Sequence, residues 1–299
     1  MKFEMKNYLK PCAAVSIAIM VIALVMTMMG MGMNLGIDFT GGTLMTYNMG
    51  QQFDVADVSA ALNACGVADA QIAATGENNT QVQIRIKDVE NTDDLRDALE
   101  EALSASYPAI EYVDITRVGA VVGGELISNA IKSLTLAGVL MLVYIAFRFD
   151  LYSGLAAIIG LVHEVAIMMS FVVILRSFIR VETTFIAALL TIVGYSINNT
   201  IIIFDRIRET RAKPGFTQVD MMDVVEVSVA STLSRTINTT LTTLFTLVCL
   251  YIFGVSSIKE FAFPLLVGML AGTYSSVLLS GQVWAMWDKK LSANKAKKA

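Results

Sequence analysis

The composition of this chain indicates a membrane protein. Its 299 residues are 55% hydrophobic and only 16% charged, whereas soluble domains are about 25% charged. One soluble core of this size cannot bury so much apolar surface, so a lipid bilayer must solvate much of it. The net charge of -4 and the lack of a basic stripe exclude a nucleic-acid partner.

The first 37 residues are predicted to form a cytoplasmic N-terminus and a membrane anchor. Lys2, Lys6 and Lys10 precede an apolar run over 12–33. This run is longer than the roughly 7–15 apolar residues of a signal-peptide core, and no small-x-small cleavage pattern follows it. We therefore expect residues 1–37 to be retained, with a first transmembrane helix.

Residues 38–129 are predicted to form a small α+β domain. Alternating apolar side chains indicate strands, as in Gln81–Ile86, and apolar stripes indicate helices, as at Leu95, Leu99 and Leu103. Three strands and two helices are expected in the order β-α-β-α-β, over 42–47, 55–65, 81–86, 92–104 and 109–118. This order is typical of a compact ferredoxin-like sandwich.

Residues 130–288 are predicted to form five further transmembrane helices. The whole chain is then expected to be an α-helical membrane protein with six transmembrane helices. Each apolar run is close to the ~20 residues that a helix needs to cross the hydrocarbon. The runs lie near 130–147, 154–175, 183–204, 236–255 and 262–284. A basic tail, 289–299, follows them.

The basic residues of the short loops set the expected orientation, because cytoplasmic loops are rich in Lys and Arg. With both termini inside, thirteen such residues face the cytoplasm and three lie in the short outer loops. Residues 38–129 are then extracytoplasmic (periplasmic), between the first and second helices.

Polar side chains lie inside the predicted spans, where an ionisable group costs at least about 2.5–3.5 kcal/mol to insert. The fourth and fifth spans each carry them on one face, which predicts a hydrated or hydrogen-bonded seam between the two helices. The seam candidates are Asn198, Asn199, Asp205, Arg235, Asn238, Thr239 and Thr242. Interhelical hydrogen bonding explains the threonines best, whereas Arg235 either snorkels outward or faces inward as a counter-charge.

His163 and Glu164 form an ionisable pair midway along the third span. Two roles remain open for this pair, a proton relay and a structural hydrogen bond. A zinc-binding helix would need a second His where Ile167 stands, so metalloprotease chemistry is excluded.

The sixth span spaces small residues four apart, at Gly268, Gly272 and Ser276, which predicts close packing against a neighbouring helix. Elsewhere the sequence shows no phosphate-binding loop, no Ser/His/Asp arrangement and no metal-ligand cluster. We therefore expect neither an enzyme nor a cofactor.

Four motifs resemble the signatures of the SecD and SecF family of protein-export membrane proteins. They are Gly36-Ile37-Asp38-Phe39-Thr40-Gly41-Gly42-Thr43, Leu161-Val162-His163-Glu164-Val165, Val193-Gly194-Tyr195-Ser196-Ile197-Asn198-Asn199-Thr200 with Phe204-Asp205-Arg206-Ile207-Arg208-Glu209, and Ser234-Arg235-Thr236-Ile237-Asn238-Thr239. In the first motif we expect Asp38 to fix a turn and Gly41-Gly42 to act as a hinge.

The resemblance implies half of an RND-type transporter in the bacterial inner membrane. It implies pairing with a SecD subunit, which supplies six further helices, and association with the SecYEG channel and the translocating preprotein, all within membrane lipid. The proton-motive force would then drive motions of the periplasmic domain that help to export the preprotein.

One position departs from the family pattern. The family assigns proton passage to an acidic residue of the fourth helix and an arginine of the next, and this chain has Asn199 and Arg235 there. An amide does not titrate, so coupling would run through the SecD partner's aspartate, through His163 and Glu164, or with a different ion or stoichiometry. Asp205 is a weaker substitute, because it lies roughly 9 Å further along the helix.

Two other functions remain open. Half of an exporter of lipids or small molecules would need a larger external domain or a fused second half. A non-coupled assembly scaffold of the translocase is favoured by Asn199 and opposed by the polar stripe that contains Arg235.

Overall fold

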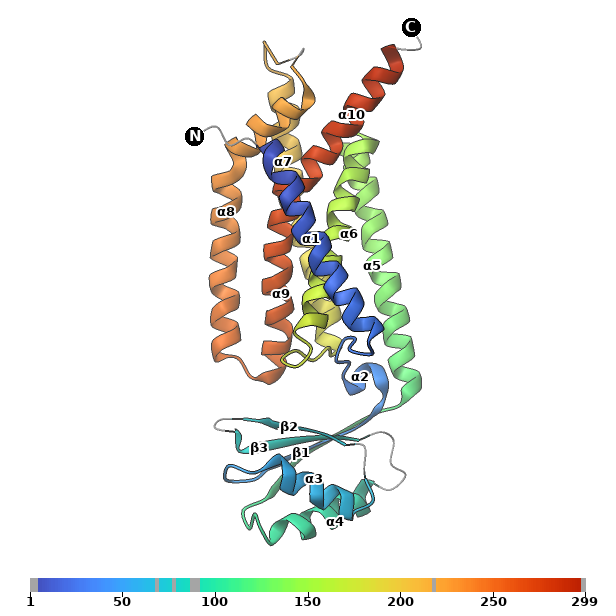
Figure 1. Ribbon diagram of the computed structural model, residues 1–299, viewed down its shortest axis with the longest axis vertical. Coiled ribbons are helices and arrows are strands. Elements are labelled where there is room, and N and C mark those ends of the chain that lie inside the picture. The colour runs from blue at the N-terminus through green and yellow to red at the C-terminus, as the bar shows by residue number, and fades with distance from the viewer. Residues whose placement is uncertain (1–4, 68–69, 77–78, 87–91, 217–218, 297–299) are drawn as a thin grey trace. The chain divides into compact units, whose positions relative to one another are not determined.

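The computed structural model describes residues 5–67, 70–76, 79–86, 92–216 and 219–296. Contacts between residues divide the chain into two compact units, Met1–Asn34 with Ile131–Ala299 and Leu35–Ala130. The first unit is a helix bundle and the second is a small α+β domain (Figure 1).

The α+β domain contains a four-stranded antiparallel sheet with the strand order β2-β3-β1-β4. Its main elements are β1 Gly42–Asn48, α3 Val55–Ala64, β2 Gln71–Thr75, β3 Gln81–Ile86, α4 Thr92–Ser104 and β4 Glu111–Val118. This βαββαβ order and this topology define a ferredoxin-like sandwich, which confirms the predicted fold of the domain. Both helices lie on one face of the sheet (Figure 1).

The core of the domain lies between the sheet and these two helices. Side chains alternate along a strand, so Met45 and Tyr47 of β1 both turn toward the helices. Ile84 of β3 and Leu99 of α4 meet them there, and all four side chains are fully buried. The domain therefore has an apolar core of its own.

Strand β2 is the element of this domain that the sequence-based prediction missed. It has only five residues, Gln71 to Thr75, and it pairs with β3 alone at the edge of the sheet. A short edge strand with two alanines has a weak strand pattern. Its presence turns the expected β-α-β-α-β order into the complete βαββαβ fold.

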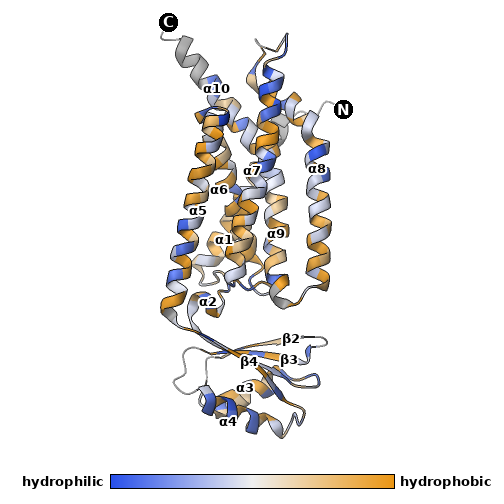
Figure 2. Ribbon diagram, turned by 180° about the vertical axis from the view of Figure 1, so that it is seen from behind, coloured by the Kyte–Doolittle hydropathy of each residue, from blue (hydrophilic) through white to orange (hydrophobic). Residues whose placement is uncertain are grey.

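Six helices among the described residues are long and apolar enough to cross a membrane, as predicted. They are α1 Met5–Met28, α5 Ala120–Arg148, α6 Leu151–Ile174, α7 Thr183–Arg211, α8 Met221–Phe253 and α9 Ser256–Ser275, which continues through a π-helical turn, Ser276–Ser280, into α10 Gly281–Ala296. Apolar residues dominate these helices over most of their length (Figure 2).

Helices α6, α7 and α9 form the centre of the bundle. Their most apolar segments are 50%, 44% and 56% buried, against 11%, 6% and 11% for α1, α5 and α8. Hydrocarbon offers a polar side chain no hydrogen bonds, so a polar group buried at the centre is expected to find its partners on the neighbouring helices.

Two helices begin well before the apolar runs that predicted them. α5 starts at Ala120 and α8 at Met221. The Asp220 side chain caps α8 by accepting a hydrogen bond from the Met222 backbone N–H at 3.0 Å. An apolar run marks only the uninterrupted apolar part of a helix, so it misses extensions in which polar and apolar residues alternate.

Candidate functional site in the helix bundle

The centre of the bundle contains a carboxyl group that makes no hydrogen bond of good geometry within the described part of the chain. Glu164 of α6 is fully buried, and neither of its carboxyl oxygens has a partner of good geometry among the described residues. The group lies directly against Gly272 of α9, where a Cβ atom would collide with Oε1. Ser196 of α7 lies beside it. Glu164 is therefore placed where α6, α7 and α9 meet.

Three consecutive side chains of α9, residues 273–275, join the surrounding helices. The first pairs with Thr240 Oγ1 of α8 at 2.9 Å, and the second with Ser16 Oγ of α1 at 2.9 Å. The third pairs with His163 Nδ1 of α6 at 2.7 Å. His163 and Glu164 are adjacent in sequence but contact different groups, so the two side chains do not form a hydrogen-bonded pair with one another.

Asn199 of α7 is also fully buried, and neither atom of its amide has a partner among the described residues. It follows Ser196 by three residues, so both lie on one side of α7, about 4.5 Å apart along the axis. The hydroxyl of Thr236, on α8, is likewise buried and unpaired within the described chain. Buried polar groups without a partner in the described chain thus occur on α6, α7 and α8.

The remaining seam candidates are exposed. They are Asn198 and Asp205 on α7, and Arg235, Asn238, Thr239 and Thr242 on α8. The two threonine hydroxyls donate to their own helix, Thr239 to the Arg235 carbonyl at 2.8 Å and Thr242 to the Thr239 carbonyl at 2.9 Å. Asp205 of α7 and Arg235 of α8 nevertheless line one pocket between the two helices, and the hydrated or hydrogen-bonded seam stays a prediction. The four residues of α8 follow helical spacing and form what we call the outer polar face.

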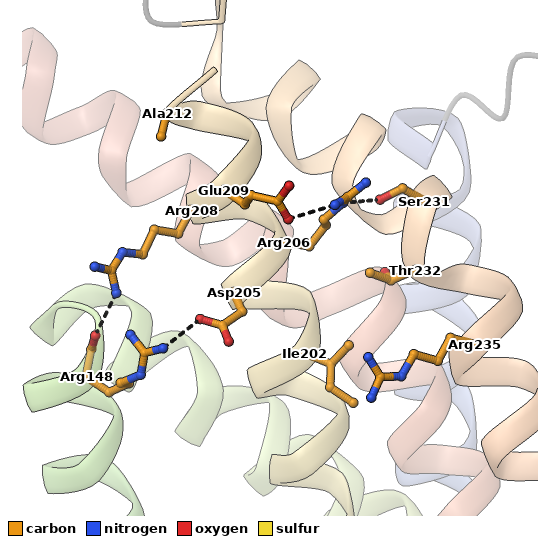
Figure 3. Close-up of a pocket in the computed structure, with 10 residues that line it drawn as sticks. All are labelled: Arg148, Ile202, Asp205, Arg206, Arg208, Glu209, Ala212, Ser231, Thr232 and Arg235. Atoms are coloured by element: carbon orange, nitrogen blue, oxygen red, sulfur yellow. Dashed lines mark hydrogen bonds and ion pairs between the residues drawn. The ribbon is translucent and has the colours of Figure 1, made fainter. Parts of the chain in front are cut away.

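An arginine-rich pocket lies beside the last turns of α7, between the end of α5 and the first half of α8 (Figure 3). It has a volume of about 820 Å³ and is lined by Arg148, Ile202, Asp205, Arg206, Arg208, Glu209, Ala212, Ser231, Thr232 and Arg235. Arg148 pairs with Asp205 at 3.3 Å and Arg206 with Glu209 at 2.7 Å. The Arg235 guanidinium has no such partner among the residues drawn (Figure 3). Asp205 is therefore held by Arg148 at the rim, away from the centre of the bundle.

Asp38, Gly41 and Gly42 lie at the start of the α+β domain. Asp38 is in the first turn of the short helix α2 Ile37–Thr40. The two glycines have φ angles of 70° and 127°, which favour glycine. A Cβ atom on Gly42 would come within 2.6 Å of the Ile86 carbonyl oxygen. The glycines thus allow a turn that brings β1 close to β3, and their hinge role stays a prediction.

The small residues of the sixth span lie against neighbouring helices. Gly268 faces Ile192 of α7, and Gly272 faces Glu164. Ser276 is buried and donates to the Gly272 carbonyl at 2.7 Å, at the start of the π-helical turn. Single π-helical turns inside α-helices are frequent at functional sites. The close contacts of α9 at Gly268 and Gly272 are therefore followed directly by the π-helical turn Ser276–Ser280.

Sequence reasoning missed several polar residues of the bundle. Ser16, Tyr274 and Ser275 were not singled out. Four consecutive hydroxyl-bearing residues, 273–276, inside an apolar span could have indicated polar contacts there. Gln282 is also buried, with its amide unpaired within the described chain. No group of three or more His, Cys, Asp or Glu side chains among the described residues could hold a metal ion.

The six apolar helices, with a ferredoxin-like domain between the first two, define a multi-pass membrane protein. The family model "Protein export membrane protein SecD/SecF, C-terminal" matches residues 98–290, and "SecD/SecF GG Motif" matches 28–52. The chain belongs to the SecD/SecF family of protein export membrane proteins, and it has a role in Sec-dependent export.

Individual relatives support this family. The protein translocase subunit SecF of Gemmatimonas aurantiaca is 34% identical over 94% of this chain and 85% of the relative. The translocase subunit SecDF of Bacillus subtilis is 34% identical over 85% of this chain but 34% of the relative. The crystal structure of SecDF, a translocon-associated membrane protein from Thermus, matches with a TM-score of 0.82 and 32% identity. That match covers 97% of this chain and 39% of the SecDF chain.

Proposed function

We propose that this chain is a SecF-type subunit that pairs with a SecD-type subunit and assists preprotein translocation through SecYEG. The outer polar face of α8 carries the proposal. Polar groups that face lipid are costly, because hydrocarbon offers them no hydrogen bonds. A second helix bundle covering this face would supply partners. The longer SecDF relatives have room for such a bundle beyond the part that this chain matches.

We further propose the orientation of the subunit in the bacterial inner membrane. Arg206, Arg208 and Arg211 gather near the end of α7, and short loops rich in Arg and Lys remain in the cytoplasm. Both chain termini are then cytoplasmic, and the segment 38–129 is extracytoplasmic, where it can meet emerging preprotein.

Site-specific cross-linking tests the pairing. One cysteine replaces Asn238 on the outer polar face, and a matched control replaces Leu136 on α5, which is also exposed. The chain's own three cysteines are first changed to serine. With a series of cysteines in the membrane helices of a SecD-type partner, we expect a disulfide to Asn238→Cys and none to Leu136→Cys. Equal cross-linking at both positions would contradict the proposed pairing surface.

Gradient dependence tests the energy source. The chain is reconstituted with a SecD-type partner and SecYEG, and preprotein release is followed with and without a proton gradient. We expect the gradient to speed release with the unmodified chain and to have a much smaller effect with Arg235→Ala. The buried amide of Asn199 favours one other function, an assembly scaffold. A chain that ignores the gradient until Asn199→Asp restores a response would establish that scaffold role instead.

A further inference from the structure

Glu164 is an ionisable residue at a position where packing alone would favour an apolar side chain. An isolated carboxylate in an apolar interior is strongly disfavoured unless it is paired or takes up a proton. Glu164 is fully buried and no Lys or Arg of the described chain pairs with it. In the arrangement observed here, the neutral, protonated form is the one that fits.

The titratable groups on the helices packed around Glu164 supply no cation at its level. Away from the helix ends these groups are His163 on α6, Tyr274 on α9, Cys12 on α1 and Tyr195 on α7. The charged residues lie toward the helix ends, among them Lys10 on α1, Lys259 and Glu260 on α9, the run 205–211 on α7, and Asp288 and Lys289 on α10. Asp288 and Lys289 are held in ion pairs with Arg211 and Asp220. His163 is bonded to Ser275, on α9. A charge on Glu164 would therefore need other groups to stabilise it.

Such groups are present on the facing helix. The hydroxyl of Ser196 lies beside the carboxyl group, and the buried amide of Asn199 follows one turn later on the same side of α7. The Asn199 amide has two N–H donors and no partner among the described residues. Hydrogen bonds from neutral donors favour the ionised form of a carboxyl group. An aspartate at position 199 could not donate in this way once ionised.

We propose that Glu164 is a reversible proton-binding site inside the membrane. Its protonated carboxyl group rests against Gly272, and its ionised form turns to the hydroxyl of Ser196 and the amide of Asn199. Glu164 would be the group of this chain that takes up a proton, and a use of that proton in export rests on the proposed function. Proton uptake by Glu164 can be measured whether or not export is coupled to it.

Infrared spectroscopy of the SecD-paired complex in lipid tests the proposal. A protonated carboxyl group in an apolar site has a carbonyl stretching band apart from those of carboxylates and amides. We expect such a band at acidic pH and its loss as the pH rises, and we expect the difference spectrum between the unmodified chain and Glu164→Gln to isolate it from any carboxyl band of the partner. The control Glu101→Gln changes an exposed acid of α4, and the band should remain there with the same pH dependence.

Two further variants separate proton binding from a merely structural role. Glu164→Asp keeps an acid at the site and should retain a titrating band. Asn199→Leu removes the proposed donors, so the band should persist to more alkaline pH. A band that never changes with pH would identify a permanently protonated structural acid and overturn the proposal, as would a band unaffected by Glu164→Gln. If preprotein release ignores the proton gradient while the carbonyl band still titrates, the proposed coupling is overturned and proton binding by Glu164 stands.

Discussion

A single methyl group at position 272 would occupy space that now holds the carboxyl group of Glu164. Overpacking of this kind costs typically about 1–3 kcal/mol, because neighbouring side chains or helices must shift. Position 138 on α5 offers the opposite case, since a Cβ atom on Gly138 would meet nothing within 4 Å.

We therefore expect Gly272→Ala to lower the free energy of unfolding and Gly138→Ala to leave it unchanged or raise it by about 0.5–1 kcal/mol. Thermal unfolding of the purified chain in detergent measures both. Similar melting temperatures for the two variants would contradict the close contact between α9 and Glu164.

Tyr47 makes the stability of the α+β domain depend on alkaline pH. Its burial in the core, followed by the nearby charge of Glu100, raises the pKa of the Tyr47 phenol above its ordinary value. An unfolded chain ionises tyrosine near pH ~10. The stabilisation is therefore complete below that pH and declines as the pH rises above it.

We expect Tyr47→Phe to unfold like the unmodified chain at neutral pH and to resist alkaline unfolding better. The phenol's one hydrogen bond is a weak contact to Met45 Sδ at 3.9 Å, so little is lost. An alkaline titration followed by tyrosinate absorbance and ellipticity checks this. Ionisation of Tyr47 without loss of the domain's ellipticity would contradict the prediction.

Residue roles were harder to predict than residue types. The sequence identified Asn199 and Arg235 as unusual, yet the structure buries one and exposes the other. A polar stripe on an apolar helix looks the same whether it faces its own bundle or a partner. Glu164 was recognisable as a buried acid, but its contact with Gly272 depends on helix packing that a single sequence does not specify.

At the scale of elements, the start of α8 depends on one aspartate. The Asp220 side chain accepts the Met222 N–H and also pairs with Lys289 of α10 at 2.7 Å. The cap is the larger contribution, since removing an N-cap costs about 0.5–2 kcal/mol, whereas exposed ion pairs contribute about 0–1 kcal/mol.

We expect Asp220→Ala to increase hydrogen exchange in the first turns of α8 and Lys289→Ala to have little effect there. Mass spectrometry of exchanged peptides over 221–230 provides the comparison. Equal protection in the two variants would mean that the ion pair, and not the cap, fixes the start of the helix.

Elements with a strong hydrophobic periodicity could be predicted from the sequence, and elements with a weak periodicity could not. The stripe of Leu95, Leu99 and Leu103 predicted α4, and all three side chains are buried. Strand β2 was missed because an edge strand buries little and needs few β-branched residues. The apolar run near 236–255 located the second half of α8 but not its start, because residues 221–235, which mix polar and apolar side chains, continue the helix before that run.

At the scale of the whole molecule, the α+β domain should fold without the helix bundle. It has its own buried cluster around Met45, Tyr47 and Leu99, and its sheet is complete within residues 42–118. We expect the isolated segment 35–119 to be soluble and monomeric, with a single cooperative transition in urea followed by circular dichroism. A molten or aggregated product would show that the domain depends on the bundle.

The outer polar face of α8 also has a consequence for the amount of this protein that a cell can maintain. A copy made in excess of its companion would leave Arg235 and Asn238 against acyl chains, a condition that favours tilting, aggregation or recognition by membrane proteases. Surplus copies would then be short-lived, and the amount of the less abundant subunit would limit the amount of the other. Degradation of unpaired copies would thereby match the numbers of the two subunits, and the four side chains of the outer polar face would be its cause.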